Sequence, residues 1–172
     1  GVGLFPFPIE HLLVPQLVIS TLSGQGHRAG HHFEAGLAAN PNDDLLLIEY
    51  GRYLIYIDRP EEALSRIRDA MRLNPLHLEW FWNIQGRSLH LLGRHADALA
   101  AFRHITNPSY YHFGYMAACY RALGESAAAE AMRARLLEAE PNFDIARFIA
   151  SLPHRSAESA QRFAVEIEWL IP

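Results

Sequence analysis

Apolar residues recur every three or four positions along most of the chain, in paired segments separated by short polar breaks. This spacing places apolar side chains on one face of an α-helix, so each segment is predicted to be an amphipathic helix. Residues 76–102 are an example, with two such segments on either side of Gly93. The pattern therefore predicts an all-helical chain built from helix pairs.

The landmarks of these pairs share one period. Alanines expected in the second helix of each pair are 34, 35 and 31 residues apart, and the prolines that end each pair are 34, 33 and 33 apart. A turn-forming residue precedes each alanine by five positions. The series are Ala29, Ala63, Ala98 and Ala129, then Pro41, Pro75, Pro108 and Pro141, then Gly24, Asp58, Gly93 and Gly124. A shared period of about 34 residues indicates a repeat protein.

A glycine lies within the predicted first helix of the third pair, where it costs about 1 kcal/mol relative to alanine. Gly86 has small counterparts in the neighbouring pairs, Gly51 and Ala117. Two antiparallel helices joined by a tight turn must pack closely, and a small residue lets their backbones approach. We therefore expect Gly86 to contact the second helix opposite Ala98, and Gly51 to do so opposite Ala63.

These residues resemble the tetratricopeptide repeat (TPR), whose pattern is W-x2-L-G-x2-Y followed by alanine, phenylalanine and proline. The third pair carries it most fully, in Trp82, Gly86, Leu89, Gly93, Ala98, Phe102 and Pro108. The resemblance covers about residues 10–143. It implies an all-α, right-handed TPR-like superhelix of about four helix-turn-helix units plus a C-terminal capping helix.

The length of 172 residues suits one hydrophobic core better than two, so we expect a single domain over residues 1–172. The first unit is degenerate, because Pro15 interrupts its first helix, and the second helix of the third unit is predicted to be short. In the cap, Phe163, Ile167 and Leu170 have the helical spacing needed to cover the last repeat. The units are expected at about 10–43, 44–78, 79–109 and 110–143, the first helix at 9–22 and the cap at 144–172.

The C-terminal part suggests a narrower resemblance. The features that carry it are the stretch EPNFDIARFIASLP, the one helix that follows it, and an interval of eleven residues from Pro75 to Gly86 that carries Trp82. With these features, this part is similar to TPR regions attached to alpha-proteobacterial class III adenylate/guanylate cyclases and related regulators. This resemblance spans roughly residues 40–172. It implies a regulatory or scaffolding segment and supplies no catalytic activity. The corresponding interval from Pro41 to Gly51 is ten residues. The extra residue of the longer interval either lies near a functional surface or is a neutral linker insertion.

The first helices of a TPR stack line its concave face, where a ligand peptide usually lies. Arginine and asparagine side chains on this face could bind a carboxylate, and the aromatic side chains could act as anchors. This loosely resembles the carboxylate clamp of chaperone-binding TPR proteins, although this chain has no lysine. The predicted peptide-binding residues are Arg52, Tyr56, Trp80, Asn83, Arg87, His90, Tyr111 and Arg121. The alternatives are that neighbours such as Glu49 and Glu79 pair with the arginines, or that another domain of the protein covers the face.

The charge balance narrows the class of partner. Nineteen acidic residues against fifteen basic ones give a net charge of −4, which argues against a general nucleic-acid or anionic-membrane binder. The longest apolar run falls well short of the roughly 20 residues of a membrane helix. The single cysteine, Cys119, excludes an intramolecular disulfide and a cysteine-based zinc site. We expect a cytoplasmic protein whose partner is a protein or peptide.

No motif predicts catalysis, because the chain has neither a glycine-rich phosphate loop nor an evident nucleophile with its base. We therefore expect no enzyme activity, cofactor or metal site. His90 and His95 are five residues apart and are expected to diverge, and Cys119 is expected to be a small core residue.

Two functions remain open at this point. The first is a peptide- or protein-binding scaffold, the interaction module of a bacterial signalling protein. The second is a dimerisation or structural segment that controls an attached cyclase or DNA-binding domain. The apolar segment GVGLFPFPIEHLLVPQLVI would serve the second function if it forms a homodimer, although it could also cap the first repeat or dock another domain.

Overall fold

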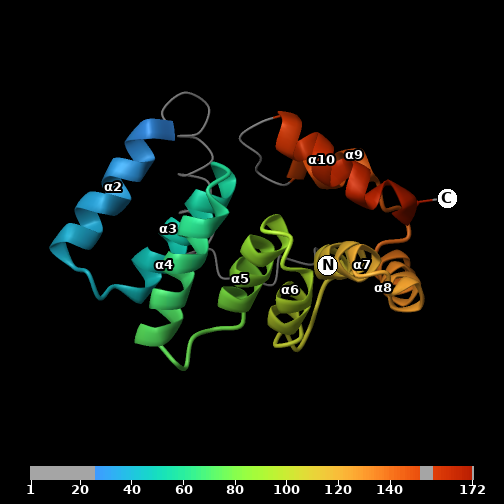
Figure 1. Cartoon of the computed structure of the whole chain (residues 1–172), viewed down its shortest axis with the longest axis horizontal. Helices are drawn as coiled ribbons and strands as arrows, with labels where there is room; N and C mark the ends of the chain where they lie inside the picture. Colours follow the sequence, from blue (N-terminus) through green and yellow to red (C-terminus); the bar gives the residue numbers. More distant parts are fainter. Residues whose placement is uncertain (1–25, 152–156, 172) are drawn as a thin grey trace, which may run out of the picture. The chain divides into compact units, whose positions relative to one another are not determined.

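The structure is a computed structural model that describes residues 26–151 and 157–171. The chain divides into two compact units, Gly1–Pro41 and Asn42–Pro172. The described residues form nine α-helices and one short 3-10 helix, with no strand among them (Figure 1). The predicted all-helical class is confirmed, and the number of domains stays a prediction. No helix in the described part of the chain is long and apolar enough to cross a membrane.

In the first unit the structure describes one helix, α2 (Gly26–Ala39). It occupies the position predicted for the second helix of the first repeat and ends shortly before Pro41, because the residue before a proline disfavours helical backbone angles. The predicted first helix at 9–22, Pro15 and Gly24 lie outside the described residues.

The second unit contains the second, third and fourth predicted repeats, in which most of the landmark residues are present. In each repeat the two helices pack mainly against each other, and the second helix of one repeat contacts the first helix of the next. The first helices also contact one another in sequence order, as Figure 1 shows. The pairs are α3 (Asp44–Tyr56) with α4 (Pro60–Leu73), α5 (Trp80–Leu91) with α6 (His95–Phe102), and α7 (Tyr110–Ala122) with α8 (Ser126–Ala139).

The tight turns within the pairs fall where the landmark series places them. Asp58, Gly93 and Gly124 have φ angles of 60°, 70° and 77°. This left-handed region is open to glycine and is tolerated by aspartate better than by most residues. The predicted turn residues of the second, third and fourth repeats are therefore confirmed.

The structure also explains the glycine inside α5. A Cβ added at Gly86 would lie 2.6 Å from Cε1 of Phe102, and the three nearest atoms all belong to that ring. At Gly51 the nearest atom is Cγ1 of Ile67, at 2.7 Å, with the backbone oxygen of Ala63 at 3.3 Å. Close approach to the second helix is confirmed, but the group that requires glycine at position 86 is the Phe102 ring rather than Ala98.

Helix α6 has eight residues whereas α4 and α8 have fourteen each. The prediction that the second helix of the third repeat is short is therefore confirmed. The linker before α7 is hydrogen-bonded to the residue that precedes α5. The backbone N–H of Thr106 donates to Oε2 of Glu79 at 3.0 Å.

The C-terminal cap consists of α9 (Ile145–Ser151), α10 (Ala157–Ile167) and the 3-10 helix Glu168–Leu170. Phe163, Ile167 and Leu170 are all buried, as their spacing predicts. Helix α10 packs on α9 and α7. Arg133 of α8 donates from Nε to the carbonyl oxygen of Leu170 at 2.9 Å, which fixes the end of the cap on the last repeat.

Candidate functional site

The predicted peptide-binding residues come from the first helices of three successive repeats. Because neighbours three or four positions apart share a helix face, Asn83 and Arg87 lie together on α5, between α3 and α7. Helix α3 carries Arg52 and Tyr56, α5 carries Trp80, Asn83, Arg87 and His90, and α7 carries Tyr111 and Arg121.

Arg87 is at the centre of this set. Its side chain is buried, with 7% of the residue exposed. The guanidinium carbon lies 5.5 Å from the centre of the Tyr56 ring and 5.8 Å from that of Tyr111. Cation–π contact with two rings stabilises a guanidinium out of water, and guanidinium is the cation best suited to it. The structure thus brings together Tyr56, Arg87 and Tyr111 from three separate helices.

The Arg87 guanidinium keeps its charge. Burial alone would lower the pKa of Arg87, but the tyrosine hydroxyls around it, those of Tyr111, Tyr115 and Tyr56, raise that pKa above its ordinary value. For the Tyr111 hydroxyl, burial has the opposite effect and raises the pKa, which favours the neutral form. The site therefore holds a permanent positive charge among neutral aromatic side chains.

Two polar atoms of this site have unused hydrogen-bonding capacity. Nε of Arg87 and Oδ1 of Asn83 are buried, and neither has a hydrogen-bond partner in the described part of the chain. No described carboxylate lies within ion-pair distance of Arg87. Unpaired buried polar atoms are costly and uncommon, so a donor and an acceptor one helical turn apart indicate where a ligand could bind.

The other two arginines already have contacts within the chain. Arg52 forms an ion pair with Glu49, as the alternative of paired neighbours anticipates. Arg121 is exposed and lies over the Trp169 ring, 4.7 Å from its centre. Glu79 bonds to Thr106 and forms no described ion pair with an arginine of this face. Arg87 is therefore the arginine best placed to receive an added carboxylate.

His90 is on α5 but belongs to a different cluster. Its Nδ1 atom lies 3.5 Å from Sγ of Cys119, and its Nε2 lies 3.0 Å from Oε2 of Glu166. The His90 and His95 rings are 5.5 Å apart, so the expectation that they diverge is wrong. That expectation used only the five-residue spacing, whereas the turn at Gly93 reverses the chain and brings His95, at the start of α6, back beside His90.

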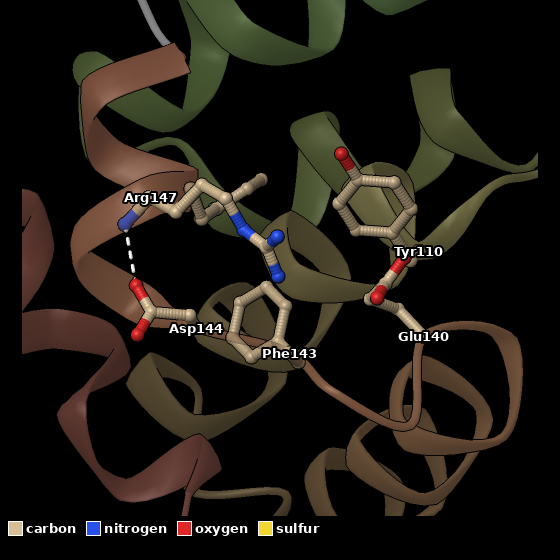
Figure 2. A pocket seen from close by; sticks show the side chains of 6 residues that line it. Tyr110, Glu140, Phe143, Asp144 and Arg147 are labelled. Atoms are coloured by element: carbon tan, nitrogen blue, oxygen red, sulfur yellow. Dashed lines mark hydrogen bonds between the residues drawn. The ribbon is translucent and has the colours of Figure 1, made fainter.

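A pocket of about 330 Å³ lies beside the last repeat and was not predicted from the sequence (Figure 2). Aromatic side chains line it, and Arg147 donates from Nη2 to the carbonyl oxygen of Asn142 at 3.0 Å. In Figure 2 the Arg147 guanidinium lies beside the Phe143 ring, on the side that faces Tyr110. The lining residues are Tyr110, Glu140, Phe143, Asp144, Arg147 and Phe148.

The pocket combines an apolar wall with one cation and two carboxylates at its rim, so it suits a side chain with an aromatic or aliphatic body and a polar end. The sequence signal was present in two phenylalanines with an arginine between them, at 143, 147 and 148. It was missed because a hollow depends on how α7 and α9 pack, and local spacing does not give that.

The sequence matches no protein-family profile and no curated protein at a significant level. The fold, however, is similar to solved structures of MamA. A crystal structure of MamA superposes with a TM-score of 0.64 at 16% identity, over 86% of this chain and 90% of that one. MamA 41-end from Desulfovibrio magneticus RS-1 gives a TM-score of 0.66 at 15% identity, over 91% and 94%. The chain thus has the TPR-like helical solenoid fold.

Proposed function

We propose that this chain is a non-catalytic scaffold that binds a peptide or protein partner through a carboxylate group, at the face formed by α3, α5 and α7. The observation that carries the proposal is the buried Arg87 guanidinium, which contacts two tyrosine rings while its Nε remains without a hydrogen-bond partner in the described structure. A charged donor with spare capacity is suited to an acidic side chain or a chain terminus.

A ligand would reach Arg87 past side chains that are only partly buried. Trp80, Asn83 and Tyr111 are each partly exposed around the buried guanidinium. Tyrosine and tryptophan supply flat contact area with few rotatable bonds, which is why they are frequent at binding hot spots. An incoming carboxylate would bond to Arg87 and the peptide body would pack on these rings.

The biological setting is part of the same proposal. The narrower resemblance of residues 40–172 supports an interaction module of a bacterial signalling protein. A single buried cysteine is compatible with a reducing, cytoplasmic compartment.

The test is a peptide-library selection on the full chain, with every peptide made both with a terminal carboxylate and as its C-terminal amide. Peptides with acidic side chains or a terminal carboxylate should be enriched. Arg87→Met, which removes the charge and keeps most of the volume, should weaken binding about tenfold to a hundredfold, since a hydrogen bond to a charged group is worth about 1.5–3 kcal/mol.

The matched control is Arg68→Met, the same change on the exposed surface of α4. Circular dichroism should show both variants folded. Because Arg87 is buried, Asn83→Ala serves as a second variant that leaves the charge in place, and it should also weaken binding. No enrichment of acidic or carboxylate peptides, or equal losses in the Arg87 and Arg68 variants, would rule out this role for the face.

A second function, self-association, is favoured by a separate observation. Leu45, Leu76 and Leu78 are 54%, 93% and 61% exposed. They gather at one end of the α3–α4 pair, where Nδ2 of Asn74 donates to Oδ2 of Asp44 at 2.7 Å. The predicted N-terminal dimerisation segment lies outside the described residues. Exposed apolar side chains in a group are typical of protein contacts.

Light scattering after size-exclusion chromatography separates the two functions. If the leucine group mediates self-association, the chain should elute as a dimer at low and high salt, and Leu76→Asp should make it a monomer. Val165→Asp, at a 53% exposed position on α10, is the control and should leave the dimer intact. A concentration-independent monomer would leave the Arg87 face as the working surface.

A further inference from the structure

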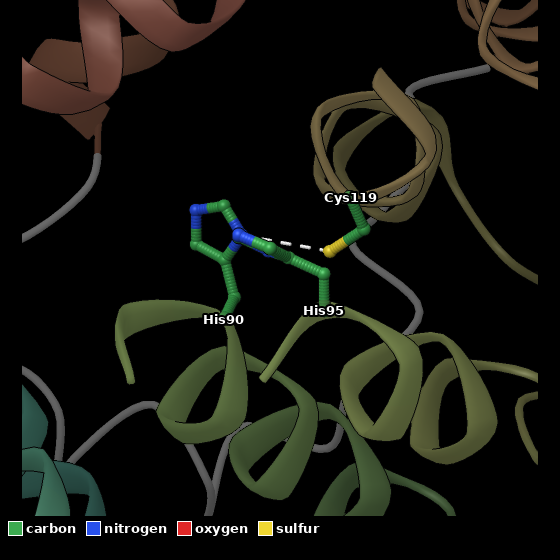
Figure 3. Close-up of side chains that lie close together, drawn as sticks. All are labelled: His90, His95 and Cys119. Atoms are coloured by element: carbon green, nitrogen blue, oxygen red, sulfur yellow. Dashed lines mark hydrogen bonds between the residues drawn. The ribbon is translucent and has the colours of Figure 1, made fainter. Parts of the chain in front are cut away.

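Three metal-ligating side chains converge from three helices at the centre of the second unit. His90 comes from the end of α5, His95 from the start of α6 and Cys119 from α7 (Figure 3). One ligand atom of each lies within 4.8 Å of the others. His90 and Cys119 are buried and His95 is half-buried.

The carboxylate of Glu166 sets the tautomer of His90. Its Oε2 lies 3.0 Å from Nε2 of His90, so Nε2–H donates to it and the lone pair of His90 is left on Nδ1. That Nδ1 points at Sγ of Cys119, 3.5 Å away. A histidine whose second nitrogen is held by a carboxylate is the usual arrangement of a metal ligand, because the carboxylate orients the ring and makes it more basic.

His95 supplies the third donor. Its Nδ1 is buried and has no hydrogen-bond partner in the described structure. The neutral form of an imidazole is the one that binds metal ions. An unpartnered nitrogen beside a thiol and a second imidazole has no structural role that the described contacts reveal.

We propose that His90, His95 and Cys119 form a binding site for a divalent metal ion of the zinc class, with Glu166 as the residue that positions His90. Imidazole nitrogens and thiolate sulfurs are both ordinary ligands of Zn²⁺. The fourth coordination position is left for water or another small donor. The proposal does not depend on the peptide-binding function.

The distances suit a tetrahedral ion. With metal–sulfur bonds of about 2.3 Å and metal–nitrogen bonds of about 2.0–2.1 Å, ligand atoms in a tetrahedral site are about 3.3–3.7 Å apart. The Sγ–Nδ1 separation of Cys119 and His90 is already 3.5 Å. The other separations are at most 4.8 Å, so the set must contract by about 1 Å to close on an ion.

The thiol state in the metal-free protein is consistent with this assignment. In the absence of a metal ion, the S–H of Cys119 can donate to Nδ1 of His90, 3.5 Å away. A bound cation takes the place of that proton, because a coordinating thiol is deprotonated outright. Entry is open on the side of His95 and of Glu166, whose side chain is 40% exposed.

An ion at this position would connect α5, α6 and α7 directly, and α10 through Glu166. Its binding free energy would add to the stability of the folded state. The site would thereby join the last two repeats and the C-terminal cap, which already share one buried apolar cluster.

The first test is a Co²⁺ titration of the full, reduced, metal-free chain. Co²⁺ substitutes for Zn²⁺, and the expected result is a thiolate-to-cobalt charge-transfer band together with the intense visible bands of tetrahedral coordination, at one ion per chain. Competition with Zn²⁺ should remove the bands. Zn²⁺ should also raise the midpoint of thermal unfolding, as any ligand of the folded state does.

Three variants assign the ligands. Cys119→Ser should abolish the charge-transfer band, and His95→Gln, at a half-buried helix start that tolerates exchange, should weaken Zn²⁺ binding by more than a hundredfold. Glu166→Gln should weaken it about tenfold to a hundredfold, the usual effect of removing a group that orients a ligand. His104→Gln is the matched control, because His104 is exposed and stacks on Trp82 away from the cluster.

The outcomes are distinct. Absence of the tetrahedral spectrum at one equivalent of Co²⁺ would overturn the proposal, as would a charge-transfer band that persists in Cys119→Ser. If His104→Gln weakened binding as much as His95→Gln, the ion would be bound by surface histidines instead. Circular dichroism of each variant checks that a lost signal does not come from unfolding.

Discussion

The α5–α6 pair and the α7–α8 pair have the same repeat design but differ in how tightly their helices approach. At Gly86 an added Cβ would lie 2.6 Å from the buried Phe102 ring, whereas at Gly114 it would lie 3.5 Å from Cδ1 of Leu136, an ordinary contact. Both glycines are in first helices and both are buried. Gly114 lies three residues earlier in its repeat than Gly86 does in its own, since the counterpart of Gly86 is Ala117. At each position the partner side chain on the facing helix decides whether a glycine is required.

The two pairs also differ in polar content. Helix α5 buries Arg87, Ser88 and His90, whereas the residues buried on α7 are small, aromatic or sulfur-containing. Ser88 donates from Oγ to the carbonyl oxygen of Pro60 at 2.8 Å, which links α5 to the preceding repeat. The third repeat therefore supplies the buried polar side chains of the Arg87 face and of the histidine cluster, and the fourth supplies Tyr111 and Cys119.

The largest expected effect comes from deleting the ring that fills the α5–α6 contact. Phe102→Ala should destabilise the protein by about 3–5 kcal/mol, because it removes a fully buried side chain and leaves a cavity. Urea denaturation measures this. Leu136→Ala, at the contact with Gly114 in the α7–α8 pair, should cost about 2–5 kcal/mol. A much smaller loss at Phe102 would mean that the ring does not fill that contact.

The next effect tests the glycines directly. Gly86→Ala should cost about 1–3 kcal/mol by overpacking, while Gly114→Ala should be neutral or stabilise the protein by up to about 1 kcal/mol through helix propensity. In a Phe102→Ala background the penalty at Gly86 should disappear, because the clashing atoms are gone. A penalty that remained there would indicate that backbone contact, not the ring, excludes the side chain.

The start of α7 should contribute a pH-dependent part of the stability, and the start of α5 should not. Nδ1 of His112 accepts from the backbone N–H of Ser109 at 3.0 Å, which requires the neutral ring, whereas the start of α5 has no side-chain cap. Burial, together with the charge of Arg87, lowers the pKa of His112 from 6.5 to about 4. The unfolded chain then binds more protons between these values, so this stabilisation is complete above pH 6.5 and is lost as pH falls towards 4.

A shift from 6.5 to about 4 corresponds to at most about 3 kcal/mol of stability, because one pKa unit is worth about 1.4 kcal/mol. Urea denaturation at a series of pH values measures it. His112→Gln keeps an acceptor at the third helical position and cannot titrate, so the wild type should lose stability relative to this variant as pH falls. Parallel pH profiles for the two proteins would contradict the assignment to His112.

The smallest effect is expected at the exposed end of α7. Arg121→Ala removes a cation–π contact with Trp169 and should cost about 0.5–1 kcal/mol. The indole N–H of Trp169 donates to the carbonyl oxygen of Glu166 at 3.1 Å, so the ring should stay in place without the arginine. Thermal unfolding monitored by tryptophan fluorescence checks both points. A loss above about 2 kcal/mol would show that Arg121 has a larger structural role.

The amino-acid sequence by itself determined the repeat. Prolines, turn residues and helical alanines act locally, through backbone angles and residue size, so their period gave the helix pairs, the turns at Asp58, Gly93 and Gly124, and the short α6. The capping residues Phe163, Ile167 and Leu170 were likewise predictable, because helical spacing fixes which side of a helix is apolar.

Only the tertiary structure decided which polar side chains meet. Arg87 lies between tyrosines from two other helices, and His90 meets His95 and Cys119 because a turn and a helix crossing bring them together. The pocket at Phe143 and Arg147 has the same origin. Local spacing reports the face of one helix, whereas a site formed by three helices depends on how closely they pack, and that is set by contacts such as Gly86 with Phe102.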